Sequence, residues 1–182
     1  MKIAIVKLSA LGDIVHAMVA LQFIRQAYPD CEIDWVVEER FAGVLLDNPD
    51  INQVLTVNLK SLKENKWNFF KEFKKIRQYA ENNYDLVIDA QGLIKSALTA
   101  RLISKNTAGF DSNSIREKPA SYLYKKCVAV AYDANTIDRN VAVICQPLGI
   151  KVTEQQILDK SCFLYYKQRD NKLEQYLSHD KP

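Results

Sequence analysis

The sequence predicts an α/β protein in which helices cover both faces of a doubly wound parallel sheet. Two observations lead to this fold class. Short β-rich segments alternate with amphipathic helical segments along most of the 182 residues, which is the order that parallel sheets with crossover helices require. The first β-rich segment also passes through a turn at Gly12 into apolar residues at helical spacing. Because 48% of the residues are hydrophobic, the chain can bury a substantial core.

Each element is predicted from its local pattern. Strands are predicted where short apolar runs rich in β-branched residues occur, at Lys2–Lys7, Glu32–Val37, Gln53–Val57, Tyr84–Ala90, Thr107–Phe110 and Cys127–Tyr132. Helices are predicted where apolar residues recur every three or four positions, at Ile14–Ile24, Glu39–Leu46, Trp67–Asn82, Leu93–Ile103, Lys118–Tyr124 and Thr136–Leu148. Residues 1–150 are therefore expected to form one domain. Residues 151–182 are polar around a strand-like run, Cys162–Tyr166, and are expected to end the domain and lead into a linker.

Composition argues against several classes of protein. The sequence contains four widely spaced cysteines, no CxxC pair and two histidines. This pattern predicts neither a zinc site nor a disulfide scaffold. The cysteines are expected to be buried thiols in a reducing compartment. Lys7, Gly12 and Asp13 interrupt the apolar N-terminus, so no signal peptide is predicted, and no apolar run reaches the ~18 residues of a membrane span. We therefore expect a cytoplasmic protein that lies peripherally at a membrane.

The loop after the first predicted strand, SALGD, is the first candidate site. Ligands of open α/β sheets bind beyond the carboxyl ends of the strands, where this loop places Ser9, Gly12 and Asp13. Gly12 permits the close approach of a ligand. Asp13 can be a simple helix cap or an ionised carboxylate directed into a ligand cleft. The loop lacks the glycines of a dinucleotide fingerprint and the GK[ST] of a P-loop.

A second polar cluster, DAQGLIK, follows the fourth predicted strand. It places Asp89, Gln91, Gly92 and Lys95 at the same edge of the sheet as Asp13, because the carboxyl ends of parallel strands share one edge. A single aspartate there can be structural. A run of Asp, Gln and Lys around a glycine is harder to explain by capping alone. A role in ligand binding is therefore considered together with a structural role.

The net charge is only +3, so a site for an acidic partner has to arise from local clustering. The stretch Lys60–Arg77 is such a cluster, with seven cations, two acids and four interleaved aromatic residues. It can be the solvated face of a helix, or it can bind an anionic and partly apolar surface such as a membrane. No nucleic-acid-binding motif accompanies it. Arg116 and Arg139 are isolated guanidinium groups of the kind that bind carboxylate or phosphate.

Together these segments resemble the lipopolysaccharide heptosyltransferase family. The resemblance rests on KLSALGDIVHAMVAL, DWVVEERFA, YDLVIDAQGLIKSAL, GFDSNSIREKPASYLY and the DR of TIDRN, which occur in the family's order. It implies a GT-B enzyme with two Rossmann-like domains, of which this chain is the N-terminal, acceptor-binding half. Such enzymes transfer L-glycero-D-manno-heptose from ADP-heptose to the inner Kdo of Kdo-lipid A, with inversion and without a metal or other cofactor. The DAQGLIKSA segment favours the enzyme that adds the first heptose.

The resemblance also implies roles for single residues. Asp13 matches the general base of the family. A basic loop near lipid A matches residues 60–66, and Asn135 stands where the family carries a histidine. The residues that the resemblance places at the acceptor are Ser9, Gly12, Lys60, Lys63, Gln91, Lys95, Arg116 and Arg139.

The partners implied are Kdo-lipid A, an anionic membrane surface, and ADP-heptose held mainly by a second domain that this chain does not contain. No nucleic acid is expected. Two other functions stay open: an enzyme that adds the next heptose, and a non-catalytic doubly wound binding domain such as a receiver or a flavodoxin. A receiver requires paired acids after its first strand, and this sequence lacks that pair.

Overall fold

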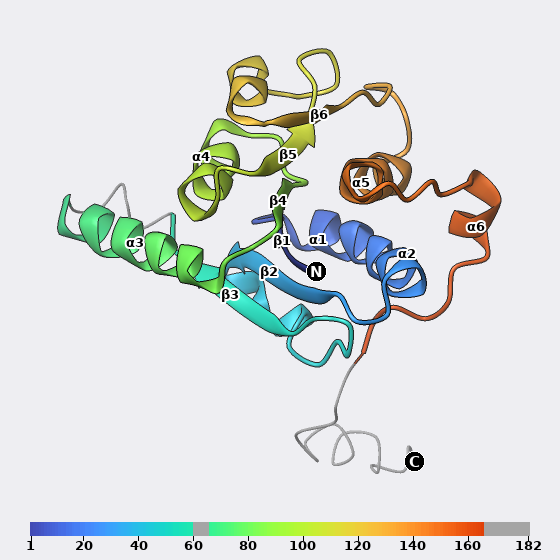
Figure 1. Ribbon diagram of the computed structural model, residues 1–182, viewed down its shortest axis with the longest axis horizontal. Helices are drawn as coiled ribbons and strands as arrows, with labels where there is room; N and C mark the ends of the chain where they lie inside the picture. Colours follow the sequence, from blue (N-terminus) through green and yellow to red (C-terminus); the bar gives the residue numbers. More distant parts are fainter. Residues whose placement is uncertain (60–65, 166–182) are drawn as a thin grey trace, which may run out of the picture.

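The computed structural model describes residues 1–59 and 66–165. Within these ranges, six parallel strands form one sheet in the order β3-β2-β1-β4-β5-β6 (Figure 1). The strands are β1 (Lys2–Val6), β2 (Glu32–Glu38), β3 (Gln53–Val57), β4 (Leu86–Asp89), β5 (Thr107–Phe110) and β6 (Lys126–Val128). The chain winds outward from β1 in both directions, so the predicted doubly wound parallel sheet is confirmed.

Helices cover both faces of this sheet, as Figure 1 shows. They are α1 (Leu11–Met18), α2 (Ala20–Ala27), α3 (Lys66–Gln78), α4 (Ile94–Ile103), α5 (Thr136–Cys145) and α6 (Glu154–Leu158). Short 3₁₀ turns lie between them: η1 (Glu39–Val44), η3 (Tyr79–Asn82), η4 (Lys118–Leu123) and η5 (Gln146–Leu148). None of the helices in the described ranges is long and apolar enough to cross a membrane.

The alternation of side chains along the strands builds two hydrophobic cores. On β1, Ile3 and Ile5 belong to the core beneath α1, α2 and α5, whereas Ala4 and Val6 belong to the core beneath α3 and α4. All four side chains are completely buried. Because both faces are covered, the strands read as continuous apolar runs, which is the pattern that made them recognisable in the sequence.

The structure corrects several predicted boundaries. The helix expected over Ile14–Ile24 is interrupted at Val19, whose N–H bonds to the carbonyl of Ala17 and breaks the regular ladder. The helices expected near Glu39–Leu46 and Lys118–Tyr124 are 3₁₀ turns, a form that short segments commonly take. The short helix α6 was not predicted.

The last predicted strand of the sheet is also shorter than expected and ends at Val128. Beyond it, the Val130 N–H donates to Ser114 Oγ (2.8 Å) and the Ala131 carbonyl accepts from Arg139 (2.6 Å). Because side chains bind these backbone groups, they do not continue the ladder to Tyr132.

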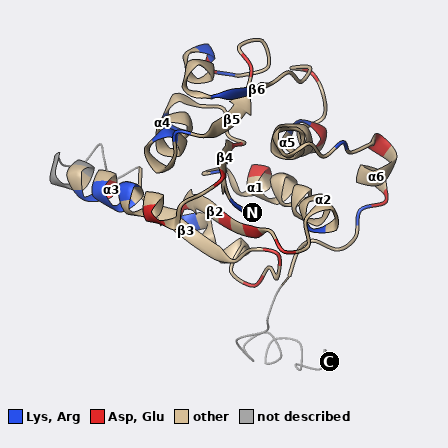
Figure 2. Cartoon of the chain, viewed as in Figure 1, with Lys and Arg blue, Asp and Glu red and all other residues tan. Residues whose placement is uncertain are grey.

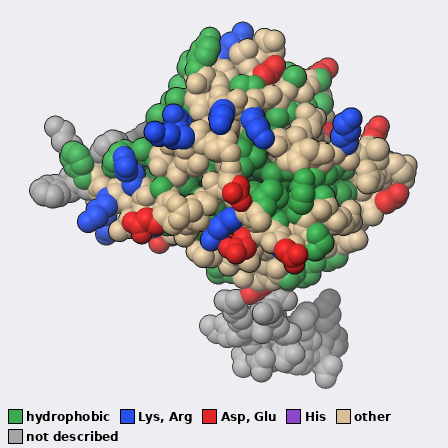
Figure 3. All heavy atoms as spheres, in the orientation of Figure 1, with side chains coloured by type: hydrophobic (Ala, Val, Ile, Leu, Met, Phe, Trp, Pro, Cys, Tyr) green, Lys and Arg blue, Asp and Glu red, His purple; other side chains and the backbone are tan. Residues whose placement is uncertain are grey.

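α3 is anchored to the sheet along one side and carries cations on the other. Ile76 is buried in the second core, and the Glu72 carboxylate accepts the Asn58 N–H at 2.8 Å. Figure 2 shows Lys and Arg concentrated along this helix, and in Figure 3 it extends from the body of the molecule. The described residues exposed on α3 include Phe70, Lys71, Phe73, Lys74 and Arg77.

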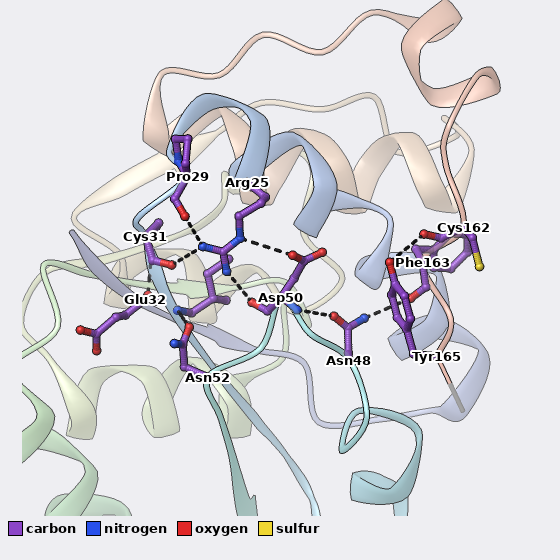
Figure 4. A network of polar contacts seen from close by, with 11 residues as sticks. Arg25, Pro29, Cys31, Glu32, Asn48, Asp50, Asn52, Cys162, Phe163 and Tyr165 are labelled. Atoms are coloured by element: carbon purple, nitrogen blue, oxygen red, sulfur yellow. Dashed lines mark hydrogen bonds and ion pairs between the residues drawn. The ribbon is translucent and has the colours of Figure 1, made fainter. Parts of the chain in front are cut away.

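The strand expected at Cys162–Tyr166 is wrong for its described residues, 162–165, which form no regular element. Side chains bind this segment instead. Asn48 Nδ2 donates to the Phe163 carbonyl at 3.1 Å, and the Ser161 N–H donates to Gln22 Oε1 at 3.0 Å. Figure 4 shows the Asn48 contact beside the Arg25–Asp50 ion pair (3.3 Å). The segment is thereby held against α2 and the turn that precedes β3.

Candidate functional site

The candidate site lies at the carboxyl edge of the sheet, where the loops after β1, β4 and β5 meet the starts of α1, α4 and α5. The N-termini of these helices point the positive ends of their dipoles toward this edge. The same edge holds seven of the residues expected to contact the substrate: Ser9, Gly12, Asp13, Gln91, Lys95, Arg116 and Arg139. Lys60 and Lys63 lie outside the described residues.

Gln91 joins two of these loops. Its Oε1 accepts the N–H groups of both Leu8 and Ser9, each at 3.1 Å. The loop that leads from β1 to Asp13 is therefore fixed to the loop after β4 by a side chain 83 residues away. Gln91 was predicted to contact a ligand. The structure shows that its amide oxygen also accepts hydrogen bonds within the protein.

Gly92 is required by the turn that presents Gln91. Its φ of +72° lies in the left-handed region that side chains rarely adopt. A Cβ at this position would also approach Ile115 to 3.1 Å and Phe110 to 3.2 Å. The glycine in the DAQG segment thus serves the backbone of the turn.

Asp89 stabilises the same turn by accepting hydrogen bonds from it. Its carboxylate is completely buried and accepts from the N–H groups of Gln91 (2.8 Å) and Gly92 (3.3 Å). The hydroxyl groups of Ser96 (2.8 Å) and Tyr124 (2.7 Å) donate to it as well. Burial raises the pKa of Asp89, and these four donors oppose the shift. The structural interpretation accounts for this aspartate fully.

Asp13 stands in the first turn of α1 and is half-buried. Its Oδ2 accepts the Ala10 N–H at 3.3 Å, so it performs part of the capping task considered from the sequence. That single long contact leaves the carboxylate with capacity for a further donor. The neighbouring Gly12 is exposed, and a Cβ there would meet no atom within 4 Å. The loop is therefore open to solvent at Gly12, the residue that precedes Asp13.

Lys7 is a member of the site that the sequence analysis treated only as an interruption of an apolar run. It follows β1 directly and is 6% exposed. Its Nζ donates to the Ala90 carbonyl at 2.8 Å and to Asn140 Oδ1 at 3.1 Å. Burial lowers the pKa of Lys7, the carboxylates of Asp13 and Asp89 oppose this shift, and Arg139 adds to it. A lysine at the carboxyl end of a buried strand is the signal that could have identified it.

The predicted cations differ in how many contacts they make within the protein. Lys95 and Arg116 are exposed. Arg139, by contrast, donates to the carbonyls of Ala131 and Ser114, each at 2.6 Å. Its guanidinium also lies 5.0 Å from the centroid of the Phe110 ring, within the range of a cation–π contact.

Asn135, which the resemblance aligns with a histidine of the family, is the N-cap of α5. Its Oδ1 accepts the Ile137 N–H at 2.8 Å, and asparagine is among the favoured residues for this task. The first turn of α5 also carries Arg139 into the site.

Comparison with known proteins identifies the family. The sequence model described as glycosyltransferase family 9 (heptosyltransferase) matches residues 72–177. The chain belongs to glycosyltransferase family 9. This family 9 chain is 40% identical over 139 residues to lipopolysaccharide heptosyltransferase 1 of Campylobacter coli, covering 76% of this chain and 39% of that protein. It is 37% identical over 158 residues to lipopolysaccharide heptosyltransferase 1 of Pseudomonas aeruginosa, covering 85% and 44%.

Solved structures agree with this assignment. The family 9 chain superposes on E. coli heptosyltransferase WaaC with ADP with a TM-score of 0.75 at 32% identity, over 85% of this chain and 49% of that one. On WaaC with ADP-2-deoxy-2-fluoro heptose the TM-score is 0.80 at 28% identity, over 100% and 55%. The chain therefore spans about half the length of these relatives, and the GT-B expectation for its sheet is confirmed.

Within residues 1–59 and 66–165 of this family 9 chain, no group of three or more His, Cys, Asp and Glu side chains could hold a metal ion. The catalytic and acceptor-binding roles of Asp13, Ser9, Gly12, Gln91 and the cations stay predictions. The structure places those of them that lie in the described ranges at one edge of the sheet, where Lys7 and Asn140 also lie.

Proposed function

We propose that this chain is the acceptor-binding half of an inverting heptosyltransferase that transfers L-glycero-D-manno-heptose from ADP-heptose to the inner Kdo of Kdo-lipid A. The observation that carries the proposal is the half-buried Asp13 carboxylate in the first turn of α1, at the edge of the sheet that also carries the exposed Lys95 and Arg116. The names of the relatives, lipopolysaccharide heptosyltransferase 1, and the ADP-heptose analogue bound to WaaC support the reaction and the donor.

Asp13 would be the general base. The acceptor hydroxyl forms a bond to the anomeric carbon while its proton passes to the Asp13 carboxylate, and the bond from that carbon to the ADP phosphate breaks. A positioned base typically contributes about 10²–10⁴-fold to such a step. Asp13 is only half-buried, which leaves it accessible to an acceptor hydroxyl.

Lys95 and Arg116 would bind the carboxylates and phosphates of the acceptor. Both are exposed on the rim of the site, and arginine in particular suits bidentate contact with these anions. Arg139 would act at the same rim and would also hold the loops after β5 and β6 in place. ADP-heptose would bind mainly to the part of the protein that this chain does not include, and we assign no cofactor.

Transfer of the first heptose is favoured over transfer of a later one. The relatives named lipopolysaccharide heptosyltransferase 1 are 33–40% identical to this chain, whereas those named heptosyltransferase 3 are 24–27% identical. A non-catalytic binding domain stays the alternative from another class, and it predicts that Asp13 can be replaced without consequence.

A chimera tests this proposal. Residues 1–160 of this chain, joined to the second half of E. coli lipopolysaccharide heptosyltransferase 1, would be expressed in an E. coli strain that lacks its own enzyme. We expect mass spectrometry to find a heptose-containing core, and expect its loss with Asp13→Asn. Asp30→Asn, an exposed aspartate at the opposite edge, is the matched control. A heptosylated core made equally well by the Asp13→Asn chimera would contradict the role of Asp13.

A direct binding experiment with the 182-residue chain tests the division of labour. Calorimetry should detect binding of a deacylated, phosphorylated Kdo-containing acceptor fragment, weakened by Arg116→Ala. It should detect no binding of ADP. Tight binding of ADP would place the nucleotide site in this chain and contradict our assignment.

We further propose that α3 docks the protein on the anionic membrane surface that carries the acceptor. Its exposed side combines the apolar side chain of Phe70, which is 66% exposed, with Lys71, Lys74 and Arg77. Near anionic lipid, each cation contributes about 1 kcal/mol. Changing all three cations to Glu should therefore weaken binding to anionic vesicles by roughly 100-fold or more.

The matched control changes three exposed lysines elsewhere, Lys105, Lys125 and Lys151, to Glu. This control changes the net charge by the same amount as the triple variant on α3, and it should weaken binding to the vesicles much less than that variant does. Binding should also fall between low and physiological salt, because charges are screened over about 8 Å at 0.15 M. Equal losses in both triple variants would show that net charge, and not α3, governs the interaction.

A further inference from the structure

Glu117 connects the two segments that carry the exposed cations of the site. Its carboxylate oxygen Oε2 accepts the Ile94 N–H at 2.7 Å. Ile94 is the first residue of α4 and directly precedes Lys95. Glu117 itself directly follows Arg116. This hydrogen bond therefore joins the segment that carries one cation to the segment that carries the other.

Capping of α4 alone does not explain why the carboxylate comes from another segment. The first turn of α4 has no acidic residue, and its N-cap, Leu93, makes no side-chain hydrogen bond to the helix. A Ser, Asp or Asn at that position would cap the helix locally. Here the acceptor of the Ile94 N–H lies 23 residues further along the chain. A cap supplied in this way stabilises the helix and also fixes the helix relative to the loop after β5.

The loop that carries Arg116 is fixed on its other side as well. Ser114 and Ile115, which precede Arg116, are 2% and 4% exposed. The Ser114 carbonyl accepts from Arg139 on α5 at 2.6 Å. Ile115 packs against the turn at Gly92, where an added Cβ would lie 3.1 Å from it. The exposed Arg116 thus extends from a backbone that is held on both sides.

Lys95 is likewise flanked by residues whose polar groups are bound. Ser96, which follows it, is completely buried, and its hydroxyl donates to Asp89 at 2.8 Å. Ile94, which precedes it, donates its N–H to Glu117. The two cations therefore start from fixed backbone positions, whereas their long side chains are exposed and can adjust to a ligand.

We propose that Glu117 is a positioning residue for the acceptor: its hydrogen bond to α4 sets the separation between Arg116 and Lys95, so that both cations meet the anionic groups of one acceptor molecule. The inference deepens the proposed function and rests on it for the identity of the acceptor. Glu117 itself does not touch the acceptor. Without its hydrogen bond, the acceptor would have to order the two segments as it binds, and this ordering would weaken the binding.

The negative charge of Glu117 separates positioning from a simple electrostatic effect. By charge alone, removal of a carboxylate near these cations should strengthen the binding of an anionic acceptor. Positioning predicts the opposite for Glu117→Ala. Calorimetry of the 182-residue chain with a deacylated, phosphorylated Kdo-containing fragment should find its Kd raised roughly 3- to 10-fold, because binding then has to order both segments. Glu117→Gln loses the charge but keeps an oxygen of equal reach, and should bind the fragment at least as tightly as the unmodified chain.

Three further variants complete the experiment. Glu117→Asp keeps the charge but is one methylene shorter, so it should lose the Ile94 N–H and bind the fragment more weakly. Addition of Glu117→Ala to Arg116→Ala should cause little further loss, because a single remaining cation has no separation to maintain. A merely structural role would add its own loss in either background. Glu81→Ala, which removes an exposed glutamate before β4, is the matched control and should leave the Kd unchanged.

Hydrogen exchange at the Ile94 amide reports the contact without any ligand. It should accelerate in Glu117→Ala and Glu117→Asp and stay slow in Glu117→Gln. If Glu117→Ala does not fold, Glu117→Asp against Glu117→Gln gives the same contrast.

Two results would overturn the inference: a folded Glu117→Ala chain that binds the fragment as tightly as the unmodified chain, or an equal loss in the Arg116→Ala background. Either result contradicts the role of Glu117 and leaves the proposed function standing. If the unmodified chain binds no fragment, the acceptor-binding assignment fails, and the role of Glu117 toward the acceptor fails with it.

Discussion

The Gln91 contacts allow a quantitative prediction for Gln91→Leu. The substitution removes one acceptor that serves two N–H groups, those of Leu8 and Ser9. Leu8 is completely buried, so its N–H would lose its partner without replacement by water, at a cost of about 1–3 kcal/mol. Ser9 is half-buried, so its N–H can bond to water instead. Losing the hydrogen bond from the Ser9 N–H should therefore cost less, about 0.5 kcal/mol. Together we expect a destabilisation of roughly 1.5–3.5 kcal/mol.

Two measurements on the 182-residue chain check this value. At this chain length 1 kcal/mol corresponds to about 2–4 °C in Tm, so Gln91→Leu should melt about 3–14 °C below the unmodified chain. Hydrogen exchange at the amides of Leu8 and Ser9 should accelerate, because the loop is no longer fixed to β4. Gln91→Glu retains an acceptor oxygen of similar reach and should preserve their protection. A Gln91→Leu chain that melts within about 1 °C of the original, with both amides still protected, would refute the reasoning.

Three further outcomes follow from other contacts. In the chimera, Asp13→Asn should lower kcat by about 10²–10⁴-fold with little change in the KM for ADP-heptose, as steady-state kinetics would measure. Gly92→Ala should lower Tm, since it strains a left-handed position and crowds Ile115. Burial raises the pKa of Asp34, and the Tyr84 hydroxyl, which donates to it at 2.5 Å, opposes the shift. When folding raises the pKa of an acid, the free energy of unfolding decreases as the pH rises from about 4 through the pKa of the folded state. Urea unfolding should therefore find Tyr84→Phe more destabilising at pH 7 than at pH 4.

The sequence predicted the sheet well because its four inner strands, β1, β2, β4 and β5, are almost entirely buried. The strands at Gln53–Val57 and Thr107–Phe110 were predicted with their observed ends, since apolar runs of this kind mark strands directly. Errors occurred where side chains bind the backbone. The end of β6 and the segment 162–165 are decided by Arg139 and Asn48, whose partners lie elsewhere in the chain. Local patterns carry no information about such contacts.

The same distinction applies to the site. Its location and its exposed members followed from the rule that ligands bind beyond the carboxyl ends of parallel strands. Lys7 and Asn140 could not be paired in advance, because 133 residues separate them and each is unremarkable in its own segment. The double role of Gln91 was hidden for the same reason, since its partners precede it by 83 and 82 residues.

These contacts divide the site into a fixed centre and an exposed rim. Lys7, Gln91 and Asn140 are bound from several elements at once, whereas Lys95 and Arg116 are exposed. A base has to be held in place if it is to contribute in the transition state, while cations that bind a large anionic acceptor can adjust to it. Changes at the centre should therefore lower kcat, and changes at the rim should raise the KM for the acceptor. The fold supplies both behaviours at one edge because hydrogen bonds between β1, the turn after β4 and α5 fix the centre, whereas the start of α4 and the loop after β5 carry the rim.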